Sequence, residues 1–147
     1  MKISYGIEIE SSPEEVFSLI KNPERAKEWM NDVTETEMLS GTPNTVGATF
    51  REVLEDQNGK IEMHGVVTGF RENESISFHL SGKYNTVDVE FRVEKFGDKT
   101  RVVQSADVQF RSFMKVMSIF FGRRFKKEIM AQSQKEFANL KSLCENI

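Results

Sequence analysis

The sequence offers few side chains that can act as an acid, a base or a nucleophile. His64 and His79 are the only histidines, and each falls on the strand face opposite its apolar neighbours, so both are expected to point toward solvent. The single cysteine, Cys144, has no base at a suitable spacing, and no serine lies in a Gly-x-Ser-x-Gly turn. No spacing of cysteines and histidines suits zinc. The sequence therefore indicates no metal and no cofactor, and it favours binding over catalysis.

Two polar residues are candidates for an interior role. Glu52 alternates with Phe50 and Leu54, and Gln104 lies in a similar run of apolar residues at strand spacing, so both can face inward. A buried carboxylate or amide needs hydrogen-bond partners, and with Tyr84 or Arg51 this pair can orient the polar end of a ligand. Burial would raise the pKa of Glu52 and so support acid–base work. The alternative is that Glu52 lies near a hairpin end and is hydrated.

The elements that must position these residues begin with a strand and two short helices. Residues 3–9 alternate between apolar and polar types, as expected for a half-buried strand. Ser12 and Glu15 form a capping box around Pro13, and Asn22 precedes another proline. The sequence therefore predicts two short helices joined by a sharp corner, the second ending near Trp29.

A meander of strands follows the helices. The period of the apolar residues changes to two, and turn residues such as those at 56–59 and 96–99 separate the runs. Gly65 and Gly69 share a strand face with Met63, where small residues leave room for either a helix or a ligand. The predicted strands cover residues 33–40, 48–54, 60–70, 75–80, 87–94 and 100–110.

Residues 112–146 form the only long segment with helical character. A helix of this length would run about 50 Å, longer than a domain of this size needs, and Gly122 is the expected break. After the break, an apolar stripe that includes Phe137 and Leu140 is expected to pack on the sheet. Before it, large apolar residues surround most of the helix. This first part can line a cavity, fill the core, or form an interface with a partner or a membrane, and these interpretations stay open.

Charge is distributed unevenly along the chain. The 147 residues carry a net charge of −3, but residues 111–147 hold eight Lys/Arg against three Asp/Glu. The basic run Arg123, Arg124, Lys126 and Lys127 can attract an anionic headgroup, a phosphate or a lipid surface. It can equally be a solvated helix face that balances an acidic body. The weak overall charge argues against a nucleic-acid partner.

Length and composition limit the class of protein. A chain of 147 residues is most simply one domain, residues 1–147, with a core of ordinary size. Twelve Phe and seven Met suit an adaptable apolar cavity as well as a core. The start of the chain does not resemble a signal peptide, no apolar run is long enough to span a membrane, and a lone cysteine fits a reducing compartment. We therefore expect a cytoplasmic protein, either a monomer or a homodimer.

Together these elements predict an α+β fold. One face of the meander is charged, so the other must be buried, and the terminal helix is the only element large enough to cover it. Short turns between neighbouring strands make the sheet antiparallel, and its twist curves it around the helix. We predict a curved antiparallel sheet of about seven strands wrapped on a long C-terminal helix, with two short helices after the first strand.

The chain resembles a known superfamily at both ends. The segment SSPEEVFSLIKNPERAKEW (11–29), after the first strand, looks like the opening of the helix-grip superfamily, also called SRPBCC. That group includes START lipid-transfer domains, plant pathogenesis-related proteins, polyketide cyclases and coenzyme Q-binding proteins. The segment FGRRFKKEIM (121–130) is similar to the C-terminal helix of bacterial members labelled polyketide cyclase or dehydrase. The resemblance implies a helix-grip fold with a hydrophobic cavity, but no single ligand or reaction.

Three functional hypotheses follow. The first is binding, with or without transport, of a small hydrophobic ligand such as a lipid, isoprenoid or polyketide between sheet and helix. The second is a cyclase or dehydratase that uses the same cavity. The third is an interaction module similar to the Hsp90-activator branch of the superfamily, with a filled interior. Transient contact with a membrane surface is compatible with the first.

Trp29 stands where family members often place an aromatic residue at the cavity mouth, although it can also simply pack the corner. The predicted cavity-lining residues are Trp29, Phe50, Glu52, Met63, Phe78, Phe91, Gln104, Phe110, Phe113, Met117, Phe120 and Phe121.

Overall fold

The computed structural model describes residues 1–56 and 59–146. The side chains of Asp56, Ser112, Phe113, Met114 and Ser118 lie outside this description. The elements, in chain order, are β1 (Lys2–Ile9), α1 (Pro13–Lys21), α2 (Pro23–Ala26), β2 (Val33–Ser40), β3 (Thr49–Asp56), β4 (Gly59–Arg71), β5 (Ser75–Ser81), β6 (Asn85–Phe96), β7 (Lys99–Phe110) and α3 (Ser112–Glu145). Among the described residues, no helix is both long enough and apolar enough to cross a lipid bilayer.

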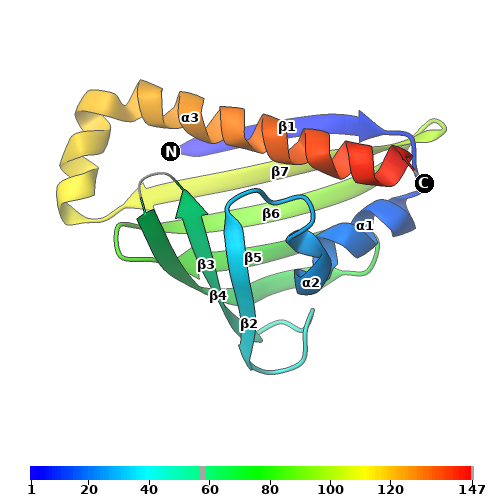
Figure 1. The fold of residues 1–147 in the computed structure, drawn as a ribbon, viewed down its shortest axis with the longest axis horizontal. Helices are drawn as coiled ribbons and strands as arrows, with labels where there is room; N and C mark the ends of the chain where they lie inside the picture. The colour runs from blue at the N-terminus through cyan, green and yellow to red at the C-terminus, as the bar shows by residue number, and fades with distance from the viewer. Residues whose placement is uncertain (57–58, 147) are drawn as a thin grey trace.

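The strands form one antiparallel sheet in the order β1-β7-β6-β5-β4-β3-β2. Strands β2 to β7 are a simple meander, and β1 closes the far edge by pairing with β7. Helix α3 lies along β1 and β7, and α1 and α2 lie on the same side of the sheet (Figure 1). The predicted architecture, a seven-stranded antiparallel sheet with two short helices and a long C-terminal helix, is confirmed.

Local hydrogen bonds start both short helices where the sequence predicts. The Ser12 side chain accepts a hydrogen bond from the Glu15 amide at 3.2 Å, which begins α1. The Asn22 side chain accepts one from the Glu24 amide at 3.0 Å, which begins α2 directly after α1 ends. These two caps set the corner that brings the segment after α2 toward the sheet.

Helix α3 consists of two parts with a kink between them. Phe121 has non-helical backbone angles (φ −120°, ψ 17°), so the break lies one residue before the predicted position at Gly122. A glycine destabilises the helix locally because it lacks a side chain, which makes the adjoining turn easier to distort. After the kink, the predicted stripe with Phe137 and Leu140 is buried together with Ser133 and Cys144, whereas Ile129 and Met130, which were also predicted to belong to it, are half-buried.

The main core lies where α1, α3 and the sheet meet. Phe137 contacts the rings of Tyr5, Trp29 and Phe91, with centroid distances of 5.6, 6.2 and 6.3 Å. The Trp29 indole N–H donates a hydrogen bond to the Leu19 carbonyl at 3.0 Å. Because α3 packs on β1 and β7, it leaves the concave face of strands β2 to β6 only partly covered. That face is where a site can form.

A candidate ligand cavity between sheet and helix

A cavity of about 420 Å³ lies between the concave face of the sheet and the helices. All three helices and strands β2 to β7 contribute to its wall. The wall is mainly apolar, with Ile20, Met30, Val33, Met38, Phe50, Leu54, Ile61, Met63, Val67, Phe78, Leu80, Val87, Val89, Phe91, Ala106, Val108 and Ile129. A volume and lining of this kind suit a small hydrophobic molecule.

Strand alternation explains how the sheet builds this wall. On β6, Val87, Val89 and Phe91 face inward, while the residues between them face outward. The antiparallel register pairs Val87 with Val108 and Phe91 with Gln104 on β7. Each inward position of β6 therefore lies beside an inward position of β7, and the two strands form a continuous apolar surface that includes the Gln104 amide.

Gly65 leaves room for an aromatic ring rather than for the helix or a ligand. Gly65 pairs with Phe50 across β3 and β4, and a Cβ built on Gly65 would lie 2.2 Å from Cζ of the Phe50 ring. The ring therefore lies across the glycine, where any larger residue would displace it. Phe50 also meets Phe78 edge-on at 5.5 Å between centroids, so this part of the wall is a fixed aromatic surface.

Two of the carboxylates on the cavity wall have raised pKa values, one on the sheet and one on the helix. Burial raises the pKa of Glu52 on β3. Burial, and then the negative charges of Asp32 and Glu52, raise the pKa of Glu136 on α3 to about 7, although a hydrogen bond with Gln132 opposes the shift. Glu136 can therefore hold or release a proton near neutral pH.

The charged residues of the described wall are predominantly acidic. Asp32, Glu52 and Glu136 line the cavity, and Lys21 is the one cation among the described lining residues. Lys21 forms an ion pair with Glu72, outside the cavity. Lys21 therefore does not neutralise the negative charge of the wall. This remaining negative charge affects which polar groups of a ligand the cavity can accept.

The structure places six of the predicted lining residues on the wall: Phe50, Glu52, Met63, Phe78, Phe91 and Gln104. Of the other predicted residues, Trp29, Phe110, Met117, Phe120 and Phe121 do not line the cavity. Trp29 is a core residue, packed against Phe91 and Phe137, because the corner after α2 turns its ring inward behind the wall. Phe110 instead packs against Phe125 at 5.6 Å between ring centroids.

The predicted residues in the first part of α3 whose side chains the structure describes also lie away from the cavity. Met117 is half-buried but is not part of the wall, and Phe120 and Phe121 are exposed. The side chain of Phe113 lies outside the described part of the structure. The physical reason is the kink at Phe121, which directs the first part of α3 away from the rest of the helix (Figure 1).

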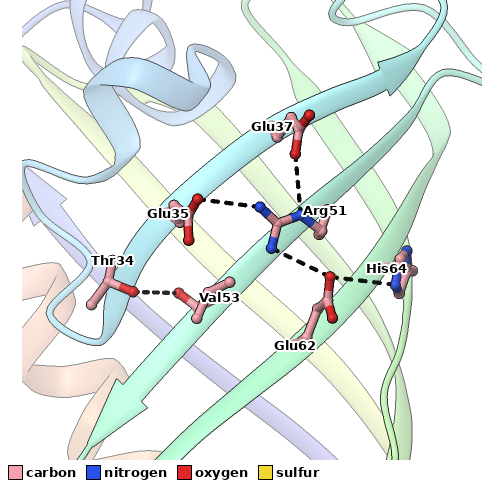
Figure 2. Close-up of polar contacts among 7 residues, drawn as sticks. All are labelled: Thr34, Glu35, Glu37, Arg51, Val53, Glu62 and His64. Atoms are coloured by element: carbon pink, nitrogen blue, oxygen red, sulfur yellow. Dashed lines mark hydrogen bonds and ion pairs between the residues drawn. The ribbon is translucent and has the colours of Figure 1, made fainter.

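The remaining candidates for chemistry lie on the outer surface. Figure 2 shows Arg51 among three carboxylates from neighbouring strands, Glu35, Glu37 and Glu62, at 3.2, 3.2 and 3.3 Å. His64 lies 3.8 Å from the same Glu62. This ion-pair network joins β2, β3 and β4 on the face opposite the cavity, so neither Arg51 nor His64 can contact a ligand in the cavity.

Three further candidates do not contribute either. His79 pairs with Asp88 at 2.7 Å on the outer face, and the Tyr84 ring is exposed beneath Lys83. Burial raises the pKa of the Cys144 thiol to about 11, so this group is protonated and unreactive near neutral pH. No cluster of three or more metal-binding side chains occurs within residues 1–56 and 59–146.

Glu136 is the main functional candidate that the sequence interpretation missed. It follows Ile129, Gln132 and Ser133 at helical spacing on α3, and all four line the cavity. The signal was present in the sequence, because a carboxylate at this spacing borders the buried stripe of Phe137 and Leu140. Its environment depends on Asp32 and Glu52, which no local pattern places beside it.

Comparison with known proteins supports this description. The family model for polyketide cyclase/dehydrase and lipid transport matches residues 1–145. None of the curated proteins compared with the chain matches it significantly. Among solved structures, a START superfamily protein from Mycobacterium smegmatis is 19% identical with a TM-score of 0.81, over 99% of this chain and 97% of that one. A Thermus thermophilus protein is 15% identical with a TM-score of 0.81, over 97% of this chain and 95% of that one. A major latex-like protein from Panax ginseng is 11% identical with a TM-score of 0.72, over 99% of this chain and 97% of that one. At these identities the structural matches show a shared fold.

Proposed function

Since the chain belongs to the polyketide cyclase/dehydrase and lipid transport family, we propose that it binds a small hydrophobic ligand between the sheet and α3. The family and the fold fit a domain that binds hydrophobic ligands. The observation that carries the proposal is the cavity of about 420 Å³ with a mainly apolar wall. Each Å² of apolar surface that a ligand buries there contributes roughly 25 cal/mol before the costs of association.

The carboxylates suggest how the ligand is oriented. Glu52 and Glu136 offer hydrogen-bond acceptors when ionised, and Gln104 offers an amide on the same wall. A ligand with a hydroxyl or amine group satisfies these acceptors, whereas a ligand carboxylate would be repelled by them. We therefore propose a neutral or cationic amphiphile, such as a lipophilic alcohol or amine, in preference to a free fatty acid.

A second candidate function is acid–base catalysis in the same cavity. The observation that favours it is Glu136, whose pKa of about 7 suits proton transfer near neutral pH. Cyclisation and dehydration both need a proton removed at one atom and one added at another, and Glu52 and Glu136 are a pair that can share these tasks. Under this alternative, Glu136→Gln retains ligand binding and abolishes turnover.

The interaction-module hypothesis has less support. It requires a filled interior, and the cavity of about 420 Å³ is not consistent with that requirement. Its other requirement, an exposed apolar patch, is met on the first part of α3.

Titration with N-phenyl-1-naphthylamine, a neutral dye that fluoresces strongly in apolar sites, tests the binding proposal. We expect saturable binding at one site per chain and displacement by a long-chain alcohol. A fluorescence increase no larger than that with an unrelated protein lacking a cavity would count against ligand binding.

A further inference from the structure

The first part of α3 projects from the body of the protein. Figure 1 shows the start of this helix turning sharply away from its remainder at one end of the molecule, opposite the C-terminus. The kink at Phe121 separates it from the part that packs on β1 and β7. We call residues 111–127, the first turns of α3 with the basic run after the kink, the α3 tip.

Large apolar side chains are exposed on the α3 tip. Ile119 and Phe120 are 77% and 75% exposed, and Val116 and Phe121 are also exposed. Single exposed apolar residues are common on protein surfaces, but four within six consecutive positions form a concentrated patch. Such a patch is costly in water, and it indicates a surface that is covered by a partner.

The charge of the α3 tip is entirely positive. Residues 111–127 contain six Lys/Arg and no Asp/Glu, whereas the rest of the chain holds fourteen Lys/Arg and all twenty-three Asp/Glu. Arg111, Arg123, Arg124, Lys126 and Lys127 are all exposed. The protein is therefore strongly polarised, and a negatively charged surface would attract it with the α3 tip foremost.

We propose that the α3 tip docks on the surface of an anionic lipid bilayer. The boundary between headgroups and acyl chains accepts Ile119, Phe120 and their apolar neighbours, while anionic headgroups pair with the Arg and Lys side chains. A nucleic acid would use the cations but leave the exposed Ile119 and Phe120 without an apolar environment.

The position of the α3 tip relative to the cavity suits this role. Ile129 lines the cavity, and it follows Phe121 on the same helix by roughly 12 Å along the axis. A protein docked by the α3 tip thus holds its cavity close to the lipid surface. The docking proposal rests on exposure and charge alone, so it is independent of the proposed cavity function, and the dye titration and the vesicle experiment can fail separately.

The test is flotation of the full chain with two kinds of vesicle, pure phosphatidylcholine and phosphatidylcholine mixed with phosphatidylglycerol. We expect binding to the mixed vesicles, at least about tenfold weaker binding to the neutral ones, and release by high salt. Ile119→Ser with Phe120→Ser removes the apolar contact, and Arg123→Gln with Lys126→Gln and Lys127→Gln removes charge. Each set should reduce binding at least about tenfold.

Matched controls use exposed residues far from the α3 tip. Phe96→Ser removes an exposed ring, and Lys60→Gln with Lys95→Gln removes two exposed charges; both should leave vesicle binding unchanged. Since every changed side chain is exposed, circular dichroism should show folded protein throughout. The proposal is overturned if the mixed vesicles do not bind the wild-type chain or if the α3-tip variants bind as well as the controls. A homodimer that Ile119→Ser with Phe120→Ser dissociates, without vesicle binding, would instead assign the patch to a second copy of the chain.

Discussion

Glu52 on β3 and Glu136 on α3 line the same cavity, and the charge of Glu52 is one of the factors that raise the pKa of Glu136, after burial and Asp32. This relationship joins β3, the strand next to the β2 edge of the sheet, to the terminal helix across a mainly apolar space. It makes the cavity a place where the protonation of a wall residue depends on pH.

Replacing Glu136 by Gln should stabilise the protein at high pH but not at low pH. The native Glu136 keeps its proton up to about pH 7, whereas the unfolded chain releases it near 4.5, so ionisation costs the native state stability as pH rises between these values. Glu136→Gln removes that cost. The free energy of unfolding of the variant should match wild type below about pH 4.5 and exceed it by roughly 1–3 kcal/mol at pH 8.

Urea denaturation across this pH range measures the effect. The control is Glu94→Gln, which removes an exposed carboxylate from the outer face of β6 and should show no such window. A Glu136→Gln difference that stays constant with pH would mean that this carboxylate is not buried in the native protein.

Replacing Val87 by Trp should block ligand uptake without unfolding the domain. Val87 lines the cavity and is only half-buried, so an indole at this position can project into the empty space rather than into packed core. We expect binding of N-phenyl-1-naphthylamine to weaken at least tenfold, on the order of 1.4 kcal/mol. The matched control is Glu94→Trp, on the outer face of the same strand. Equal dye binding by both variants would place the dye site elsewhere.

Ligand charge should affect affinity. In competition with the dye near pH 8, decylamine should bind at least about tenfold more tightly than decanoate, because a hydrogen bond to a charged group contributes about 1.5–3 kcal/mol. The double variant Glu52→Gln with Glu136→Gln should remove most of this preference. A preference for decanoate in the wild-type protein would contradict the proposed orientation of the ligand.

The two parts of α3 should differ sharply in their contribution to stability. Phe137 is buried among three aromatic rings, so Phe137→Ala should cost about 3–5 kcal/mol in the free energy of unfolding. Phe120 is 75% exposed, so Phe120→Ala should change the free energy of unfolding by less than about 0.5 kcal/mol. Thermal unfolding of the two variants measures the contrast. Similar losses would mean that the α3 tip packs on the body of the protein.

Much of the fold was predictable because its signals are local. The capping residues Ser12 and Asn22 start helices, the alternation of Val87, Val89 and Phe91 sets a strand face, and Gly122 marks a break within one residue. Each of these effects depends on neighbours a few positions away. The strand order then follows from short turns, which pair consecutive strands.

The candidate site was only partly predictable, because it depends on where α3 crosses the sheet. Inward spacing pointed to Phe50, Glu52 and Gln104, which lie on the wall. The spacing of residues could not show that α3 lies along β1 and β7. Because of this position of α3, Glu136 faces the cavity and Trp29 lies behind the cavity wall. Apolar composition alone also assigned Phe120 to the cavity, although the kink places it in solvent.

The central claim is that the cavity holds a small hydrophobic ligand in the cell. Native mass spectrometry of the chain and of Val87→Trp, each purified from the natural host, tests this claim most directly. We predict that the wild-type protein carries a discrete additional mass that organic solvent extracts, and that Val87→Trp lacks it. Wild-type protein free of any additional mass, or an equal mass on both proteins, would contradict the account.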